Sequence, residues 1–353
     1  MPLAVAAAAL AAAALAAGGS PAAAGARAHP RKPKPGRAVT LEWVGDMALS
    51  TERGLPPGGV ATAAAPLKRQ LQNADITAGN LEGTLSTGGA SKCGGGDTST
   101  CFAFQAPPSY AGQYRALGFD IVNQANNHAF DYGASGHQQT VNALTKAGLE
   151  YTGSPGQITY LRVHHTRVAF VGFAPYSWAS NLLDIPGAKA LVRRARKHAD
   201  LVVVFIHAGA EGANQTHTPH GSEFFLGENR GDPRAFAHAV IDAGASIVLG
   251  SGPHVIRGVE RYRGRVIAYS LGNFIGYHTL GTGGVLSESA ILRVTLAQNG
   301  HVTAGDWIPV TLGSDGLPRR DCSDASAHLV ARLSREDFPH DHWNIGPHGT
   351  FRL

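Results

Sequence analysis

Continuous apolar runs and helical patterns alternate along most of the chain. The runs are short and unbroken, as expected for strands covered on both faces of a sheet, and they occupy residues 39–44, 76–78, 119–122, 201–206 and 247–249. Helical periodicity lies between them, at residues 67–73, 108–117, 134–147, 187–198 and 233–243. Hairpin patterns at residues 160–173 and 255–269 and strands at 291–296 and 301–308 complete the set. This alternation predicts an α/β fold.

Polar residues that suit metal binding follow the ends of these runs. They are Asp46, Glu82, Asn127 with His128, His207, and His254. Strands of one sheet bring their carboxyl ends to the same edge, so we expect these side chains to converge. Carboxylate, amide and imidazole groups suit hard to borderline divalent ions such as Mn²⁺, Zn²⁺ or Fe²⁺. The pattern therefore predicts a divalent-metal site at one edge of a sheet.

The two carboxylates also have ordinary structural explanations. Asp46 could cap a loop, because Gly-Asp ends many strands. Glu82 could form an ion pair with Arg53 or Lys68.

The same holds for the amide and imidazole groups. Asn127 and His128 could belong to a buried turn network, and His207 and His254 could be core histidines. We expect Asp131 to be structural, orienting His128 through a hydrogen bond.

Composition and charge narrow the possible functions. A chain of 353 residues has room for one large domain or two smaller ones, and its 43% apolar content suffices for a full core. The formal net charge is +5, but basic residues crowd into residues 27–37, which leaves the remainder near neutral. Basic and aromatic residues do not interleave, so we expect no nucleic-acid binding.

The amino-terminal segment is typical of a secretory signal peptide. The apolar run at residues 3–17 is shorter than the ~20 residues of a membrane-spanning helix, and small residues follow it. No Lys or Arg precedes Arg27, so an uncleaved anchor stays open as the alternative. We expect a signal peptide at residues 1–28, a basic Pro-rich linker at 29–38, a domain at 39–312 and a tail at 313–353, in a protein that is secreted or associated with the cell surface.

Cysteine usage agrees with export. Cys93 and Cys101 flank a Gly/Ser/Thr-rich loop and are close enough in sequence to pair, so we expect a disulfide there. Cys322 is left over as a free thiol.

Six motifs occur in an order that resembles a known family. They are Gly45-Asp46, Asn80-Leu81-Glu82-Gly83, Ala125-Asn126-Asn127-His128-x-x-Asp131-x-Gly133, His207-x-Gly209-x-Glu211, Gly252-Pro253-His254-Val255 and Tyr269-Ser270-Leu271-Gly272-Asn273-Phe274. Together they resemble the CapA (PgsA) family of capsule and poly-γ-glutamate synthesis proteins, within the calcineurin-like metallophosphoesterase superfamily. The similarity spans roughly residues 39–311.

The resemblance implies a four-layer α/β/β/α sandwich with a site for one or two divalent ions. Asp46 and His254 would hold the first metal, Glu82 would bridge, and Asn127 and His207 would hold the second.

The other motif residues receive supporting roles by the same resemblance. His128 would be the catalytic acid. Residues expected to surround the ligands or contact substrate are Asn80, Asn126, Asp131, Glu211 and Asn273.

The sequence departs from the superfamily pattern at two positions. Ala48 and Gly252 stand where phosphoesterases have histidine, and each change removes one ligand from one metal. Two functions therefore stay open: an exported metal-dependent hydrolase acting on a phosphoester or an amide, and a non-catalytic wall protein that binds an anionic polymer such as poly-γ-glutamate. A plain adhesin is the weakest alternative, because it would not need ligands at strand ends. The resemblance also implies a membrane synthase complex as a partner.

Overall fold

The computed structural model describes residues 37–94 and 101–352, which all belong to one compact unit. The predicted signal peptide and most of the predicted linker lie outside the described residues. Among the described helices, none is long and apolar enough to cross a membrane.

The first sheet combines parallel strands with an antiparallel extension. Its order is β19-β18-β17-β1-β2-β5-β6, and β16 pairs with the end of β1. The parallel strands are β1 (Val39–Met47), β2 (Ile76–Leu81), β5 (Ile121–Asn123), β6 (Glu150–Thr152) and β16 (Asn273–Ile275). The antiparallel strands are β17 (Glu288–Leu296), β18 (Val302–Leu312) and β19 (Pro318–Arg320).

The second sheet has the order β14-β15-β13-β10-β8-β7, and β9 pairs with β8. Its parallel strands are β8 (Thr166–Ala174), β9 (Ser180–Asn181), β10 (Leu201–His207), β13 (Ile247–Ser251) and β15 (Arg265–Ala268). The antiparallel strands at its edges are β7 (Thr159–Val163) and β14 (Val259–Tyr262). The two predicted hairpins are thus confirmed, although β14 begins later than expected because residues 252–258 form an irregular segment.

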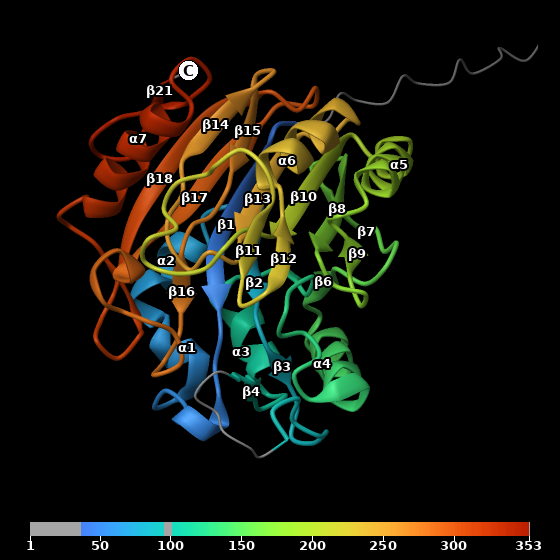
Figure 1. Cartoon of the computed structure of the whole chain (residues 1–353), viewed down its shortest axis with the longest axis vertical. Helices are drawn as coiled ribbons and strands as arrows, with labels where there is room; N and C mark the ends of the chain where they lie inside the picture. The colour runs from blue at the N-terminus through green and yellow to red at the C-terminus, as the bar shows by residue number, and fades with distance from the viewer. Residues whose placement is uncertain (1–36, 95–100, 353) are drawn as a thin grey trace, which may run out of the picture. The chain divides into compact units, whose positions relative to one another are not determined.

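The two sheets pack face to face around a shared apolar core. Trp43 of β1 stacks on Phe205 of β10 with ring centroids 4.5 Å apart. The outer face of the first sheet is covered by α1 (Gly59–Ala63), α2 (Lys68–Leu71), α3 (Tyr110–Leu117) and α4 (Gly133–Ala147). The second sheet is covered by α5 (Ile185–Arg196) and α6 (Pro233–Asp242), which lie beside β8, β10 and β13 in Figure 1. This arrangement confirms the predicted four-layer α/β/β/α fold.

Residues 313–352, which make up nearly all of the tail predicted at 313–353, pack onto this sandwich. β19 extends the first sheet, and α7 (Ala325–Asp337) contributes Ala327, Val330 and Leu333 to the core between the sheets. The polar sequence of this segment reflects its outer surface rather than a lack of packing.

Short elements complete the unit. They are the 3₁₀ turns η1 (Thr51–Arg53), η2 (Ala65–Leu67) and η3 (Gly284–Ser287), and the strand pairs β3 (Thr84–Leu85) with β4 (Gln105–Ala106), β11 (Glu223–Phe225) with β12 (Glu228–Gly231), and β20 (Asn344–Ile345) with β21 (Phe351–Arg352). The helix expected at residues 67–73 is divided between η2 and α2.

Candidate metal centre

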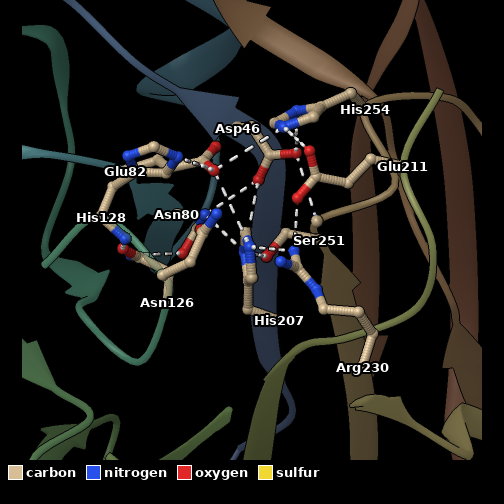
Figure 2. A network of polar contacts seen from close by, with 12 residues as sticks. Asp46, Asn80, Glu82, Asn126, His128, His207, Glu211, Arg230, Ser251 and His254 are labelled. Atoms are coloured by element: carbon tan, nitrogen blue, oxygen red, sulfur yellow. Dashed lines mark hydrogen bonds and ion pairs between the residues drawn. The ribbon is translucent and has the colours of Figure 1, made fainter. Parts of the chain in front are cut away.

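The strand ends predicted to converge do meet at one edge of the sandwich. Asp46 pairs in register with Asn80 of β2 and with Asn273 of β16, and His207 pairs with Ser251 of β13. Because both sheets end at the same edge, side chains from β1, β2, β10 and β13 face one another (Figure 2). β1 and β10 run further than predicted, so Asp46 and His207 lie within strands rather than after them.

Glu82 lies at the centre of this group. Its side chain is fully buried, and its Oε1 is 3.8 Å from Nε2 of His128, 3.8 Å from Nε2 of His207 and 3.7 Å from Nε2 of His254. Neither carboxylate oxygen has a hydrogen-bond partner among the described residues. Burial raises the pKa of Glu82 well above its ordinary 4.5, the charge of Asp46 raises it further, and His254 opposes both.

The spacing around Glu82 fits a bound cation better than hydrogen bonding. Contacts of 3.7 to 3.8 Å are too long for hydrogen bonds. Metal–nitrogen and metal–oxygen bonds of about 2.0–2.2 Å place two ligands of one ion roughly 3–4 Å apart. A buried carboxylate without a partner is costly unless a cation binds it.

Asp46 completes a compact group of ligand atoms with Glu82 and His254, all within 4.8 Å of one another. Its Oδ1 accepts a hydrogen bond from Nδ2 of Asn80 at 2.8 Å, and its Oδ2 accepts one from the backbone N–H of Gly252 at 3.2 Å. Burial alone would raise the pKa of Asp46, but the hydrogen bond and charge of His254 outweigh it and lower the pKa. Asp46 is therefore an ionised carboxylate.

His254 presents Nε2 to the cluster. Its Nδ1 lies 2.9 Å from Oδ1 of Asn273 and 3.2 Å from Oδ2 of Asp46, which are both acceptors, so Nδ1 carries the proton. Burial alone would lower the pKa of His254, but Glu82, Asp46 and Glu211 raise it to about 10. The surrounding carboxylates therefore favour the protonated form of His254.

His207 is fully buried between the two carboxylates. Its Nδ1 lies 3.2 Å from Nδ2 of Asn80 and 3.3 Å from Oγ of Ser251, which leaves Nε2 directed at Glu82. Burial lowers the pKa of His207 well below 6.5, so the imidazole is neutral and has a lone pair for a metal. Gly252 lies alongside, and a Cβ there would sit 3.3 Å from Nε2 of His207. A side chain at Gly252 would therefore be crowded against the His207 ring.

Asp131 orients His128, as the sequence analysis expected. Nδ1 of His128 lies 2.7 Å from Oδ2 of Asp131, which also accepts a hydrogen bond from the backbone N–H of Phe104. Lys92 pairs with the other oxygen of Asp131 at 2.7 Å, and the His128 ring stacks on Phe104. Burial lowers the pKa of His128 although Asp131 opposes the shift. These contacts hold a neutral imidazole with Nε2 toward Glu82.

The neighbouring amides divide into two roles. Oδ1 of Asn80 accepts hydrogen bonds from Nδ2 of Asn123 at 3.0 Å and Nδ2 of Asn126 at 3.2 Å. Oδ1 of Asn126 accepts from the backbone N–H of His128 at 3.0 Å, so Asn126 shapes the loop. Asn127 differs, because its buried Oδ1 has no hydrogen-bond partner among the described residues. Its ligand role stays a prediction.

Arg230 is a site residue that sequence reasoning missed. Its side chain is 1% exposed, its Nη2 donates to Oε1 of Glu211, and the same nitrogen lies 3.5 Å from Nε2 of His207. Oε2 of Glu211 in turn lies 3.5 Å from Nε2 of His254. Arg230 stands in a short hairpin with no motif around it, so only tertiary packing reveals its position.

A pocket of about 340 Å³ opens beside the metal centre. It is lined by Asn127, His128, Glu211 and Arg230 from the site, and by Lys92, Cys101, Phe102, Tyr176, Trp178, Phe225, Leu226 and Glu228 around them. Cys93 and Cys101 are joined by a disulfide, which ties Lys92 and Phe102 to the same wall, and Cys322 is free and exposed. Four residues of the cluster and its surroundings thus form part of the pocket wall.

Comparison with known proteins identifies relatives of the chain. Residues 40–278 match the family described as "Bacterial capsule synthesis protein PGA_cap". The capsule biosynthesis protein CapA of Bacillus anthracis is 27% identical over 335 residues, which cover 87% of this chain and 75% of that protein. The PGA biosynthesis protein CapA of Bacillus subtilis (strain 168) is 34% identical over 176 residues, which cover 45% of this chain and 43% of that protein.

Solved structures with a similar chain path are more distant. A hypothetical protein from Thermus thermophilus is 18% identical with a TM-score of 0.47, covering 76% of this chain and 98% of that chain. A 5'-nucleotidase precursor from the same organism is 12% identical with a TM-score of 0.47, covering 85% of this chain and 59% of that chain.

Proposed function

The chain belongs to the bacterial capsule synthesis protein family, and from this premise we propose that it acts in the synthesis or processing of an anionic cell-surface polymer such as poly-γ-glutamate. We also propose that the protein is exported to the cell surface, because its amino-terminal sequence is typical of a secretory signal peptide. We further propose that the protein acts together with a membrane synthase complex.

We propose that the chemistry is metal-dependent hydrolysis, and one observation carries this. Glu82 is a buried carboxylate whose oxygens have no hydrogen-bond partner among the described residues, yet three imidazole nitrogens face it at 3.7 to 3.8 Å. A purely structural carboxylate at this depth would be hydrogen-bonded. The donor set of Asp46, Glu82, His207 and His254 suits Mn²⁺, Zn²⁺ or Fe²⁺.

The residues around the centre suit cleavage of an amide or a phosphoester. A divalent cation bound there would polarise the substrate's carbonyl or phosphoryl oxygen. His128 presents Nε2 at the pocket wall and can exchange a proton there, because Asp131 fixes its Nδ1. Arg230 lines the same pocket and would position the substrate, whereas Asn127 would offer its unpartnered Oδ1 to the metal.

The test combines metal analysis with a panel of substrates. Purified protein is expected to contain Mn, Zn or Fe and to hydrolyse a chromogenic phosphodiester or a γ-glutamyl amide. His128→Ala should keep the metal and lose on the order of 10²- to 10⁴-fold in rate. Asn127→Ala should lose metal affinity first and recover partly in excess metal. Full activity of His128→Ala would contradict the catalytic assignment.

The second candidate is a non-catalytic protein that binds the polymer. It is favoured by Ala48 and Gly252, which supply no ligand at positions where phosphoesterases have histidine. In that case the cation would bind polymer carboxylates directly. Metal content without turnover on any phosphoester or amide, together with salt-sensitive binding of polyglutamate, would support this candidate over hydrolysis.

A further inference from the structure

The carboxylate of Glu228 is bound to Nη1 of Arg230, whereas Glu211 is bound to Nη2. Nη1 of Arg230 donates to the hydroxyl of Tyr176 at 2.7 Å and to Oε2 of Glu228 at 3.1 Å. The Tyr176 hydroxyl donates to the same oxygen of Glu228 at 2.8 Å. One guanidinium nitrogen and one hydroxyl thus hold a single carboxylate oxygen at the wall of the pocket.

The receiving side of this contact is rigid. Arg230 is 1% exposed, and Glu211 fixes its inner nitrogen beside His207. Its Nε is buried and has no hydrogen-bond partner among the described residues, so the guanidinium retains an unused donor. Tyr176 stacks on Trp178 with ring centroids 4.9 Å apart and planes at 10°. A buried, preoriented arginine beside a fixed hydroxyl is a suitable receptor for a carboxylate.

The bound carboxylate, in contrast, is easily replaced. The Glu228 side chain is 53% exposed and follows the tip of the β11–β12 hairpin, where Leu226 is 71% exposed. Solvent competes for so exposed a carboxylate, which weakens its ion pair with Arg230. An incoming carboxylate could therefore take its place without unfolding any element.

We propose that Arg230 and Tyr176 form a subsite for a carboxylate of an acidic peptide-like polymer, and that Glu228 occupies this subsite until the polymer displaces it. The inference rests on the proposed function, since it assigns the part of the same pocket that would recognise substrate. The subsite places a substrate carboxylate beside the metal centre, because Arg230 contacts both Glu228 and His207.

The surroundings favour a carboxylate over a phosphate. Glu211 lines the pocket and already pairs with Nη2 of Arg230, so the guanidinium charge is partly balanced and suits a monoanion better than a dianion. The flat faces of Tyr176 and Trp178 provide an apolar wall suited to the methylene groups between carboxylates of a glutamyl chain.

The test measures binding of a short γ-linked glutamate oligomer to the metal-loaded protein by calorimetry at low salt. Glu228→Gln should tighten binding by about fivefold, because the internal competitor loses its charge. Tyr176→Phe should weaken binding by about fivefold through loss of one hydrogen bond. Matched controls are Glu336→Gln, an exposed glutamate paired with Arg332 on α7, and Tyr262→Phe, whose hydroxyl faces Asp242. Both controls should bind like the wild type.

Two results would overturn the subsite. One is wild-type affinity in both Glu228→Gln and Tyr176→Phe while metal content is unchanged. The other is displacement of the oligomer by inorganic phosphate as effective as by free glutarate, which would mean general anion binding. Failure of the proposed hydrolysis is a separate outcome, visible as absent turnover in a protein whose oligomer binding still responds to Glu228→Gln.

Discussion

Two buried glutamates in this protein have opposite surroundings. Glu223, at the start of β11, is 6% exposed, and its carboxylate accepts hydrogen bonds from Nη1 and Nη2 of Arg257 at 2.8 and 2.7 Å and from the backbone N–H of Ala210 at 2.9 Å. Glu82 is 0% exposed and accepts no hydrogen bond from the described residues. Both carboxylates are buried, but only that of Glu223 accepts hydrogen bonds.

The difference separates a structural carboxylate from one kept for a ligand. Burying an unpaired charge costs several kcal/mol, so a fold retains one only where something else compensates. Glu42 follows the structural pattern, because Arg293 and the Thr77 hydroxyl bind its two oxygens. Glu82 instead has imidazole nitrogens of His207 and His254 at ligand spacing, with Nε2 of His128 also 3.8 Å away. Burial by itself therefore does not identify a site, whereas burial without partners does.

The largest effect is expected at the hydrogen-bonded Glu223–Arg257 pair. Arg257→Met leaves the Glu223 charge buried without its partner, so the free energy of unfolding should fall by about 3–5 kcal/mol. The loss should be the same in excess metal and in chelator, as measured by urea unfolding. The double variant Arg257→Met with Glu223→Gln should recover part of the loss, since no buried charge then remains. If added metal restored the lost stability, the proposed difference between Glu223 and Glu82 would be contradicted.

The second prediction tests the incomplete site. Metal at about 100 times its Kd should add about 2.7 kcal/mol to the stability of the wild type and nothing to that of Glu82→Gln. Without metal, Glu82→Gln should be at least as stable as the wild type, because the raised pKa of Glu82 shows that its charge is disfavoured in the fold. Glu223→Gln is the matched control and should lose stability equally with and without metal.

The fold could be predicted from the sequence because its signals are local. Unbroken apolar runs mark β1, β2, β5, β10 and β13, and the polar residue after or at each run's end fixes where the sheet edge lies. Strand geometry then brings Asp46, Glu82 and His207 together, and the i to i+3 spacing of His128 and Asp131 gives their contact.

The rest of the site depends on long-range packing that leaves no pattern in the sequence. Arg230 reaches His207 from a hairpin that follows a long loop, and no periodicity places it there. Arg53 and Lys68, the alternative partners for Glu82, form no ion pair with it in the described structure. The sequence indicates Glu82 as a site residue, but only the three-dimensional contacts show that its carboxylate lacks the hydrogen bonds that Glu223 has.

The third prediction compares two histidines of the same chain. His207→Ala should weaken metal binding by about tenfold or more, since it removes a neutral imidazole that faces Glu82. His217→Ala should leave metal binding unchanged, because His217 is 55% exposed and pairs with Asp337 away from the cluster. Metal content after dialysis at fixed free metal measures both. Equal losses in the two variants would contradict the site as described.

The last prediction concerns the protonation of His254. Burial alone would lower the pKa of His254, but the charges of Glu82, Asp46 and Glu211 raise it to about 10. Between about pH 6 and 8 a binding metal must therefore displace one proton from His254. The affinity of the protein for the metal should then rise about tenfold per pH unit. For the metal-free protein the sign is opposite: the raised pKa gives stability that is complete below about 6.5 and is lost as pH approaches about 10. Metal titrations across this range test the pH dependence of metal affinity, and urea unfolding tests that of the metal-free stability. The Glu223–Arg257 pair should contribute to neither pH dependence. A metal affinity that does not change with pH would mean that His254 is not a ligand, and the contrast between the two glutamates would then need another explanation.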